Sequence, residues 1–245
     1  MRRCLMLLLA LLALPAFAQQ VVYYKSLTGT GFVINNEGNV ITNAHVLQGC
    51  KIISVLTPNG EQNASIVTLD EQKDLAVLKT AYLSPTIAPL RWNIQDLKVG
   101  DEVIIMGYPG AEGASGHYVF KKTNVTNLSG PQGETRFIQL GSVAAHGNSG
   151  GPVLDGSGNV IGVISGIAMT YHADARGQPI GEPVGQADVA ITIAALQDFL
   201  QAHGIDFYES TSGTVAYGDD ELRDNAHHFI LPVRCLQSVS DKPFD

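Results

Sequence analysis

The chain has 245 residues, of which 45% are hydrophobic and 16% are charged. A charged fraction this low argues against a disordered chain and against a coiled coil. Acidic residues outnumber Lys and Arg by 23 to 15, the formal net charge is −8, and no cluster of basic residues is present. These features argue against a nucleic-acid-binding surface and indicate a globular protein with a substantial core.

Residues 1–18 have the pattern of a secretory signal peptide. Arg2 and Arg3 precede an apolar run, and the small residues Ala16 and Ala18 mark a cleavage site before residue 19. The apolar run is shorter than the roughly 20 residues that a membrane-spanning helix needs, so an uncleaved anchor is the less favoured interpretation. We therefore expect export to the periplasm or the cell exterior, with no stable insertion in a membrane.

Removal of this segment would also remove Cys4 and leave only Cys50 and Cys235. Two cysteines in an exported protein are consistent with one disulfide. They are equally consistent with two buried thiols, because the sequence does not give the distance between their Cα atoms.

Short β-branched runs separated by turn residues follow one another through the mature region. They lie at residues 31–34, 39–42, 52–56, 65–69, 75–78, 102–106, 118–126, 136–140, 152–154, 160–164 and 189–192. A Gly-rich stretch at 107–116 divides them into two groups, which favours an all-β protein with two barrel-like modules. Residues 193–202 form the one clear helical pattern, with Ile193, Leu196 and Leu200 on one face.

Residues 205–245 differ from the rest in composition. They are mostly polar, with an acidic run at 219–221 and an apolar run at 229–233. We expect a partly ordered C-terminal extension in which residues 229–236 form a further strand.

The strongest local signal for chemistry is the segment from Gly147 to Pro152, which reads Gly-Asn-Ser-Gly-Gly-Pro. A nucleophilic serine needs an exposed hydroxyl and nearby backbone N–H groups directed at the developing oxyanion. Glycines on both sides of Ser149 permit the tight backbone that this arrangement requires. By itself the segment is equally typical of a surface turn.

Two further segments favour the catalytic interpretation. His45 follows the β run 39–42 at close distance, and Asp74 directly precedes the run 75–78. In the order His, Asp, Ser, the three residues supply a general base, the group that orients it and a nucleophile.

The segment 147–151 also fits the G-x-S-x-G elbow of α/β-hydrolases. That fold would need an Asp and then a His further along the chain, such as Asp188 with His203 or His227. It would also need a helix directly after Ser149, and the sequence there predicts a strand instead.

Together these motifs resemble the trypsin-like serine proteases of the chymotrypsin fold, and most closely the HtrA/Deg-type protease domain. The resemblance covers about residues 26–200 and is carried by residues 30–34, 42–46, 74–79, 107–110, 147–152 and 160–166. It implies an all-β fold of two six-stranded antiparallel β-barrels, at about 19–110 and 111–204, with a C-terminal helix. It also implies a serine endopeptidase that cleaves protein or peptide substrates and needs no cofactor or metal.

Transferred motif by motif, the catalytic residues of the family fall on His45, Asp74 and Ser149. The oxyanion hole falls on the backbone N–H groups of Gly147 and Ser149. Asn148 occupies the position where many relatives have an Asp that binds a newly formed N-terminus, so activation by propeptide removal is not expected. HtrA-type relatives usually carry a C-terminal PDZ domain, and because few residues follow 204 we do not expect one here. A protease-fold binding module with little or no turnover is the alternative function.

The resemblance also implies a primary substrate pocket between residues 141–146 and 165–167. Val143 would lie at its floor, which favours an apolar P1 side chain, and His146 would lie at its edge or in solvent. Asp188 aligns with the back wall, where an inward carboxylate would favour Lys or Arg at P1. A solvent-facing Asp188 is the preferred interpretation. The full set of predicted pocket residues is Val143, His146, Ser165, Gly166, Ile167 and Asp188.

Overall fold

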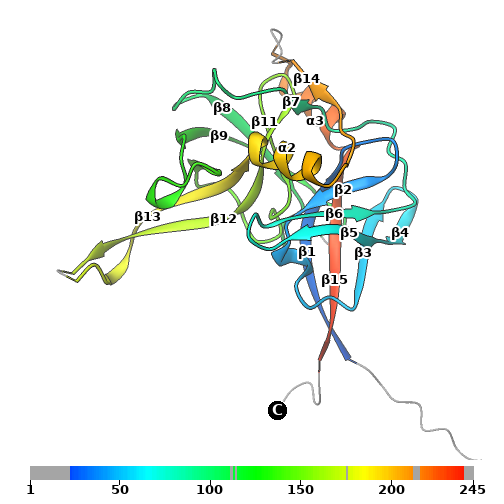
Figure 1. Ribbon diagram of the computed structural model, residues 1–245, viewed down its shortest axis with the longest axis horizontal. Helices are drawn as coiled ribbons and strands as arrows, with labels where there is room; N and C mark the ends of the chain where they lie inside the picture. Colours follow the sequence, from blue (N-terminus) through cyan, green and yellow to red (C-terminus); the bar gives the residue numbers. More distant parts are fainter. Residues whose placement is uncertain (1–22, 111–112, 114, 175, 212–215, 240–245) are drawn as a thin grey trace, which may run out of the picture.

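The computed structural model describes residues 23–239 except 111–112, 114, 175 and 212–215. The predicted signal peptide, residues 1–18, lies outside the described residues. Two β-sheets account for most of the described chain, and the short helix α2 packs over the second of them (Figure 1). The predicted all-β class and chymotrypsin-like fold with a C-terminal helix are confirmed.

The first sheet is open and antiparallel, with the strand order β4-β3-β15-β1-β2-β6-β5. Its strands are β1 (Tyr23–Val33), β2 (Asn39–Thr42), β3 (Ile52–Thr57), β4 (Gly60–Asn63), β5 (Ser65–Asp70), β6 (Leu75–Lys79) and β15 (Ile230–Val239). Strand β2 is buried along its whole length, and β6 is buried except at its last residue. These two strands therefore contribute fully buried residues to the hydrophobic core.

The second sheet closes on itself, because β11 pairs with both β8 and β12. Its strands are β7 (Leu90–Arg91), β8 (Glu102–Gly107), β9 (Val119–Asn127), β10 (Phe137–Gly141), β11 (Pro152–Leu154), β12 (Val160–Ala173), β13 (Pro179–Thr192) and β14 (Glu209–Ser210). The closed part, in the order β11-β8-β9-β10-β13-β12, is a six-stranded barrel like those predicted. The first module is instead an open sheet of seven strands.

The boundary between the two modules differs from the prediction. The sequence analysis placed it at the Gly-rich stretch 107–116, but β8 lies before that stretch and pairs with β9 in the second sheet. Strand β7 also joins the second sheet, through β12. The second module therefore begins at or before residue 90. The sequence did not indicate this, because β7 has too few residues to show a pattern.

Helix α2 (Ile193–Ala202) has the bounds that its periodicity predicts. The Thr192 side chain caps it by accepting a hydrogen bond from the Ala195 N–H. A second helix, α3 (Asp219–Ala226), was not predicted, because it buries only Leu222 and Ala226 and so lacks an apolar stripe. The structure also has two short 3₁₀ turns, η1 (His45–Leu47) and η2 (Pro131–Gly133).

The C-terminal extension takes part in the first sheet. A strand does form there, and β15 lies between β1 and β3, with Phe32 opposite Ile230 and Ile53 opposite Cys235. The side chains of Ile230, Leu231 and Val233 are buried. The last described strand of the chain is thus central to the first module.

Strands β12 and β13 are much longer than the predicted runs 160–164 and 189–192. Each has 14 residues, and their outer parts form a hairpin that extends away from the body of the molecule (Figure 1). We call residues 168–187 of this hairpin the arm. Its residues are mostly exposed and mixed in character, so their sequence lacks the alternation that marks a half-buried strand.

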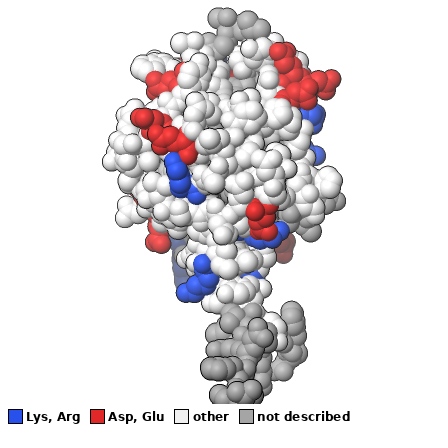
Figure 2. All heavy atoms as spheres, turned by 90° about the vertical axis from the view of Figure 1, so that its right-hand side faces the viewer, with Lys and Arg blue, Asp and Glu red and all other residues white. Residues whose placement is uncertain are grey.

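Charged side chains are sparse on the face of the molecule that Figure 2 shows. In Figure 2, acidic and basic residues lie scattered among uncharged ones, and the described residues form no basic patch on that face. Within the described ranges, no helix combines the length and apolar character needed to cross a membrane.

Candidate active site

His45 and Asp74 lie side by side at one end of the first sheet. His45 begins η1 just after β2, and Asp74 immediately precedes β6, the antiparallel neighbour of β2. The imidazole Nδ1 is 2.9 Å from each carboxylate oxygen of Asp74, and the His45 backbone N–H donates to Oδ1 at 3.0 Å. Asp74 has a φ of 55°, a left-handed conformation that is uncommon for residues other than glycine. These contacts fix the carboxylate against both the ring and the backbone of His45.

A residue of the second sheet holds the same carboxylate. The Ser165 hydroxyl, on β12, donates to Asp74 Oδ2 at 2.7 Å, and the Asn43 side chain donates to the Asp74 carbonyl at 2.8 Å. Burial of Asp74 opposes its ionisation, but the hydrogen bonds from His45 and Ser165 outweigh it and lower the pKa of Asp74 below its ordinary value. The carboxylate is therefore charged at neutral pH.

Ser149 lies on a loop that is held by backbone contacts on both sides. Its carbonyl accepts a hydrogen bond from the Thr30 N–H at 2.8 Å, and the next amide, Gly150 N–H, donates to Ile164 O at 2.8 Å. Gly147 and Gly150 have φ values of 102° and 83°, so both need the freedom of glycine. The Ser149 side chain is partly exposed.

The structure brings this loop to the His45–Asp74 pair. A Cβ atom on Gly150 would clash with the Thr42 hydroxyl and lie 3.0 Å from Asn43 N, in the segment that leads to His45. On its other side, the Gly150 N–H donates to the carbonyl of Ile164. The next residue, Ser165, donates its hydroxyl to Asp74. The segments that carry the three residues predicted as catalytic therefore lie close together where the two sheets meet.

The backbone next to Ser149 presents two available donors. The Asn148 N–H donates to Ala145 O and the Gly151 N–H donates to Asn148 O. The N–H groups of Gly147 and Ser149, in contrast, have no acceptor among the described residues. These are the two amides that the sequence predicted as an oxyanion hole, and such donors stabilise a developing negative charge.

Thr30 is a contributor that the sequence analysis did not identify. Its fully buried hydroxyl donates to Gly147 O at 2.7 Å and accepts from the Tyr108 N–H at 2.9 Å. Together with the bond to Ser149 O, these contacts clamp both ends of the segment that carries the nucleophile candidate. A buried threonine in a strand carries no local signal for this role, because its partners lie more than 70 residues away in sequence.

Asn148 is also fully buried, and neither polar atom of its side chain has a partner in the described part of the chain. Its Oδ1 would lie 3.0 Å from a Cβ added at Gly107. An Asp at this position would carry an unpaired buried charge, whereas Asn carries none. This environment fits the absence of the acidic residue on which propeptide-dependent activation relies.

The expectation of a solvent-facing Asp188 is wrong. Asp188 has an exposed fraction of 0%, and its Oδ2 accepts the backbone N–H groups of Val143 and Ala144 at 2.7 Å each. Its Oδ1 is buried without a partner among the described residues. The carboxylate points inward because it accepts the buried N–H groups of Val143 and Ala144, which would otherwise lack a hydrogen-bond acceptor.

The other predicted pocket residues differ in their relation to Asp188. Ile167 lies opposite Asp188 on the neighbouring strand, and a Cβ atom on Gly166 would meet nothing within 4 Å. The Ser165 hydroxyl donates to Asp74, a role that the sequence analysis did not assign. His146 is exposed, and its carbonyl accepts from the Gly110 N–H at 2.9 Å.

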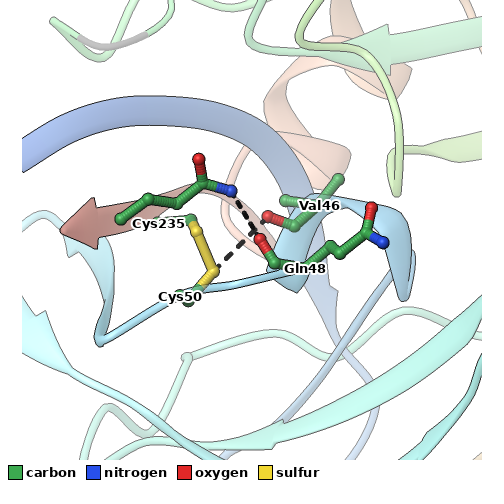
Figure 3. The surroundings of a disulfide bond; sticks show 5 residues. Val46, Gln48, Cys50 and Cys235 are labelled. Atoms are coloured by element: carbon green, nitrogen blue, oxygen red, sulfur yellow. Dashed lines mark hydrogen bonds between the residues drawn. A yellow bond between two sulfur atoms is a disulfide. The ribbon is translucent and has the colours of Figure 1, made fainter. Parts of the chain in front are cut away.

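Cys50 and Cys235 form a disulfide with a Cα–Cα distance of 5.3 Å, the first of the two alternatives that the sequence left open. Figure 3 shows it linking the segment after η1 to β15. Beside it, the Gln237 side chain donates to the Gln48 carbonyl. The disulfide therefore joins the turn that begins with His45 to the C-terminal strand.

One remaining interpretation of the sequence can be compared with the structure. The α/β-hydrolase alternative is wrong, since Ser149 is followed by strand β11 rather than by a helix. The His227 and His228 rings contact each other with centroids 3.8 Å apart and planes tilted by 38°, and His227 stacks on Tyr118. Nowhere in the described ranges do three His, Cys, Asp or Glu residues gather in a way that could hold a metal ion.

The family of trypsin-like peptidase domains matches residues 29–163. Among curated proteins, the uncharacterized protein y4bJ of Sinorhizobium fredii is 35% identical over 86% of this chain. Serine protease Rv3671c of Mycobacterium tuberculosis is 33% identical over 66% of this chain. The chain spans 32% and 42%, respectively, of the lengths of these two proteins.

Two solved protease structures are also similar to this chain. The crystal structure of the Rv3671c protease in its inactive form superposes with a TM-score of 0.55 at 28% identity, covering 73% of this chain and 84% of that one. The structure of the HtrA-type protease AlgW with a decapeptide gives a TM-score of 0.56 at 26% identity, covering 71% and 51%.

Proposed function

Because this chain belongs to the trypsin-like peptidase family, we propose that it is an exported serine endopeptidase that acts through His45, Asp74 and Ser149. The observation that carries the proposal is the pairing of His45 Nδ1 with both oxygens of Asp74. An imidazole whose Nδ1–H is bound to a carboxylate presents Nε2 as the proton acceptor, which is the tautomer that general-base catalysis requires.

The first half of the reaction forms an acyl-enzyme. His45 Nε2 takes the proton of the Ser149 hydroxyl as Oγ attacks the carbonyl carbon of the substrate peptide bond. Asp74 holds the ring and stabilises the imidazolium, while the N–H groups of Gly147 and Ser149 bind the oxyanion. The imidazolium then gives its proton to the leaving amine.

The second half hydrolyses this ester. Water loses a proton to His45 and attacks the acyl carbon, and Ser149 leaves with the proton that the imidazolium returns. All proton transfers use this chain's own side chains, so the proposed mechanism involves no cofactor. The proposal includes the removal of residues 1–18 during export. It also includes a peptidase domain that extends beyond the predicted bounds 19–204, because β15 lies between β1 and β3 in its first sheet.

The test is hydrolysis of a mixed peptide library by the purified protein, followed by mass spectrometry. We expect new peptide termini with wild type and none with Ser149→Ala. The matched control is Ser26→Ala, which removes an exposed hydroxyl of β1 and should leave hydrolysis unchanged. Cleavage that persists in Ser149→Ala would refute the assignment. Intact wild-type protein that cleaves no peptide would instead support the binding-module alternative.

A further inference from the structure

A pocket of about 560 Å³ lies between the C-terminal extension and the body of the molecule. The extension supplies β14, Tyr217 and one face of α3, and the body supplies residues 86–89 and the turn 157–159 between β11 and β12. Figure 1 shows β14, β7 and α3 together at the end of the molecule that lies opposite the free ends of β1 and β15. The volume falls within the range of small-molecule binding sites in proteins.

This pocket is separate from the candidate active site. None of the described residues that line it belongs to the predicted catalytic residues or to the predicted substrate pocket. Tyr208, Tyr217 and Leu222 line it and also lie outside residues 29–163, the segment that matches the trypsin-like peptidase domain. Much of the wall is therefore built by the C-terminal extension, and the family match does not account for it.

The wall of the pocket carries no formal charge. Among the described residues that line it there is no Lys, Arg, Asp or Glu. An ionic ligand would give up hydration on entering without meeting an opposite charge, which is costly. The lining therefore favours an electrically neutral ligand over a phosphate, a carboxylate or an amine.

Hydroxyl and amide side chains make up part of this wall. Thr86, Ser210 and Asn225 line the pocket. The Thr86 hydroxyl is buried without a partner among the described residues, and the exposed Asn225 amide makes no hydrogen bond within them. A wholly apolar ligand would leave such groups unpaired, whereas a ligand with several hydroxyls can both donate to them and accept from them.

Aromatic rings provide the apolar part of the wall. Tyr208 and Tyr217 line the pocket with exposed fractions of 56% and 42%, and Phe229 lines it from a buried position. A tyrosine combines a flat apolar face with a hydroxyl at its tip. A pyranose ring has the matching character, because one face consists of C–H groups and its rim carries hydroxyls.

We propose that this pocket binds one or two units of a neutral carbohydrate, with a sugar ring stacked on a tyrosine and its hydroxyls bonded to the amide and hydroxyl side chains. The inference goes beyond the proposed peptidase function and does not depend on it. A bound glycan would hold the protein at a carbohydrate-bearing surface or partner. The Ser149 site, which is formed by other residues, would stay open to peptide substrates.

The experiment measures the binding of three neutral disaccharides to the purified protein: cellobiose, maltose and N,N′-diacetylchitobiose. Isothermal titration calorimetry gives the affinity, and saturation-transfer difference NMR shows which sugar protons contact the protein. We expect at least one of the three to bind, with saturation transferred mainly to ring C–H protons. Cellobiouronic acid, an anionic analogue of cellobiose, should bind no more tightly, because no cationic side chain is present among the described lining residues.

Substitutions of exposed residues locate the binding site. Tyr208→Ala removes a stacking face and Asn225→Ala removes an amide, so each should raise Kd about five- to tenfold. Tyr208→Phe keeps the ring and should retain most of the affinity. Tyr24→Ala is the matched control, because it removes a tyrosine of β1 that is exposed to a similar degree, at 45%, and lies outside the pocket.

Three results would overturn the inference. The first is folded wild-type protein that binds none of the disaccharides at tens of millimolar. The second is an affinity that Tyr208→Ala and Asn225→Ala both leave unchanged, and the third is tighter binding of the anionic analogue. An uncharged peptide, acetyl-Leu-Ser-Leu-Ser-amide, that binds in this pocket when the sugars do not would assign it to peptides instead. Since no hydrolysis is measured, failure of the proposed function would not alter these results.

Discussion

The Ser165 hydroxyl and the Asp74 carboxylate are joined by a 2.7 Å hydrogen bond that crosses from the second sheet to the first. The same carboxylate receives both the ring and the backbone N–H of His45. The strand that carries Ser165 also binds the Gly150 N–H, next to the nucleophile candidate. A single strand thus fixes the His45–Asp74 pair and the Ser149 loop relative to each other.

Replacing Ser165 by Ala removes one of the hydrogen bonds that stabilise the charged carboxylate. We expect kcat to fall about tenfold, because the orientation of Asp74 against His45 is then held from one side only. The pKa of Asp74 should rise toward its ordinary value. Ser165→Thr keeps the hydroxyl and serves as the control. Steady-state kinetics that give Ser165→Ala the same kcat as wild type would show that this bond has no part in positioning the pair.

The lowered pKa of Asp74 predicts a pH dependence of stability. Because the folded state favours the ionised form, this contribution is complete above the unfolded pKa of about 3.9 and is lost as the pH falls through the lower folded pKa. Urea unfolding of wild type and Asp74→Asn, measured from neutral pH into this acidic range, gives the comparison. Wild type should lose stability more steeply than the variant. Parallel curves would contradict the prediction.

Thr30→Val should affect both stability and catalysis. The variant keeps the shape of the side chain but leaves Gly147 O and Tyr108 N–H, two buried groups, without their partner. We expect the free energy of unfolding to fall by about 2–4 kcal/mol. We also expect kcat to fall, because the segment from Gly147 to Ser149 is no longer held by the Thr30 hydroxyl. Thr30→Ser retains the hydroxyl and should behave much more like wild type. Denaturant unfolding measures the free energy of unfolding of both variants. Equal values for Thr30→Val and Thr30→Ser would argue against the clamp.

The disulfide closes a loop of 185 residues in sequence. Replacing both Cys50 and Cys235 by Ser should lower the free energy of unfolding by about 3–5 kcal/mol, chiefly by freeing the unfolded chain. Addition of a reductant should lower the melting temperature of wild type and leave that of the double variant unchanged. A reductant effect of equal size on both proteins would assign the change to something other than this bond.

Asp188 predicts the preference at P1. Its Oδ1 is buried without a donor among the described residues, so we expect a P1 side chain that brings a cation to it to gain a charge-assisted hydrogen bond that an apolar side chain cannot make. Paired substrates with Arg or its neutral isostere citrulline at P1 isolate this charge. We expect about tenfold higher kcat/KM for Arg, and a ratio near one in Asp188→Asn. Glu182→Gln, which removes an exposed charge of the same strand, is the control.

An apolar preference would have a different signature. If Val143 governs the pocket, leucine and valine substrates should exceed both arginine and citrulline in wild type. A uniform loss for all substrates in Asp188→Asn would show that Asp188 only holds the amides of Val143 and Ala144.

Local patterns in the sequence were sufficient to predict the helices and strands that bury a regular face. Helix α2 has its predicted bounds because Ile193, Leu196 and Leu200 repeat at helical spacing, and β2 has them because all four of its residues are buried between turns. The glycines around Ser149 indicated an unusual backbone, and two of them do have positive φ values.

Contacts between distant segments could not be predicted in this way. Thr30 reaches Gly147 across 117 residues, and Ser165 reaches Asp74 across 91, with no periodicity that links them. The place of β15 between β1 and β3 depends on which strand edges remain open after the rest of the sheet forms. The inward orientation of Asp188 depends on two amides that only the folded loop presents.

The most direct test of the account is covalent labelling of the protein with a fluorophosphonate, read out by intact mass and peptide mapping. A serine activated by His45 and Asp74 should add one phosphonyl group at Ser149 in wild type. Ser149→Ala should remain unlabelled, and His45→Ala should label far more slowly. Wild-type protein that is folded and carries no label, or carries it on another residue, would contradict the proposed catalytic site.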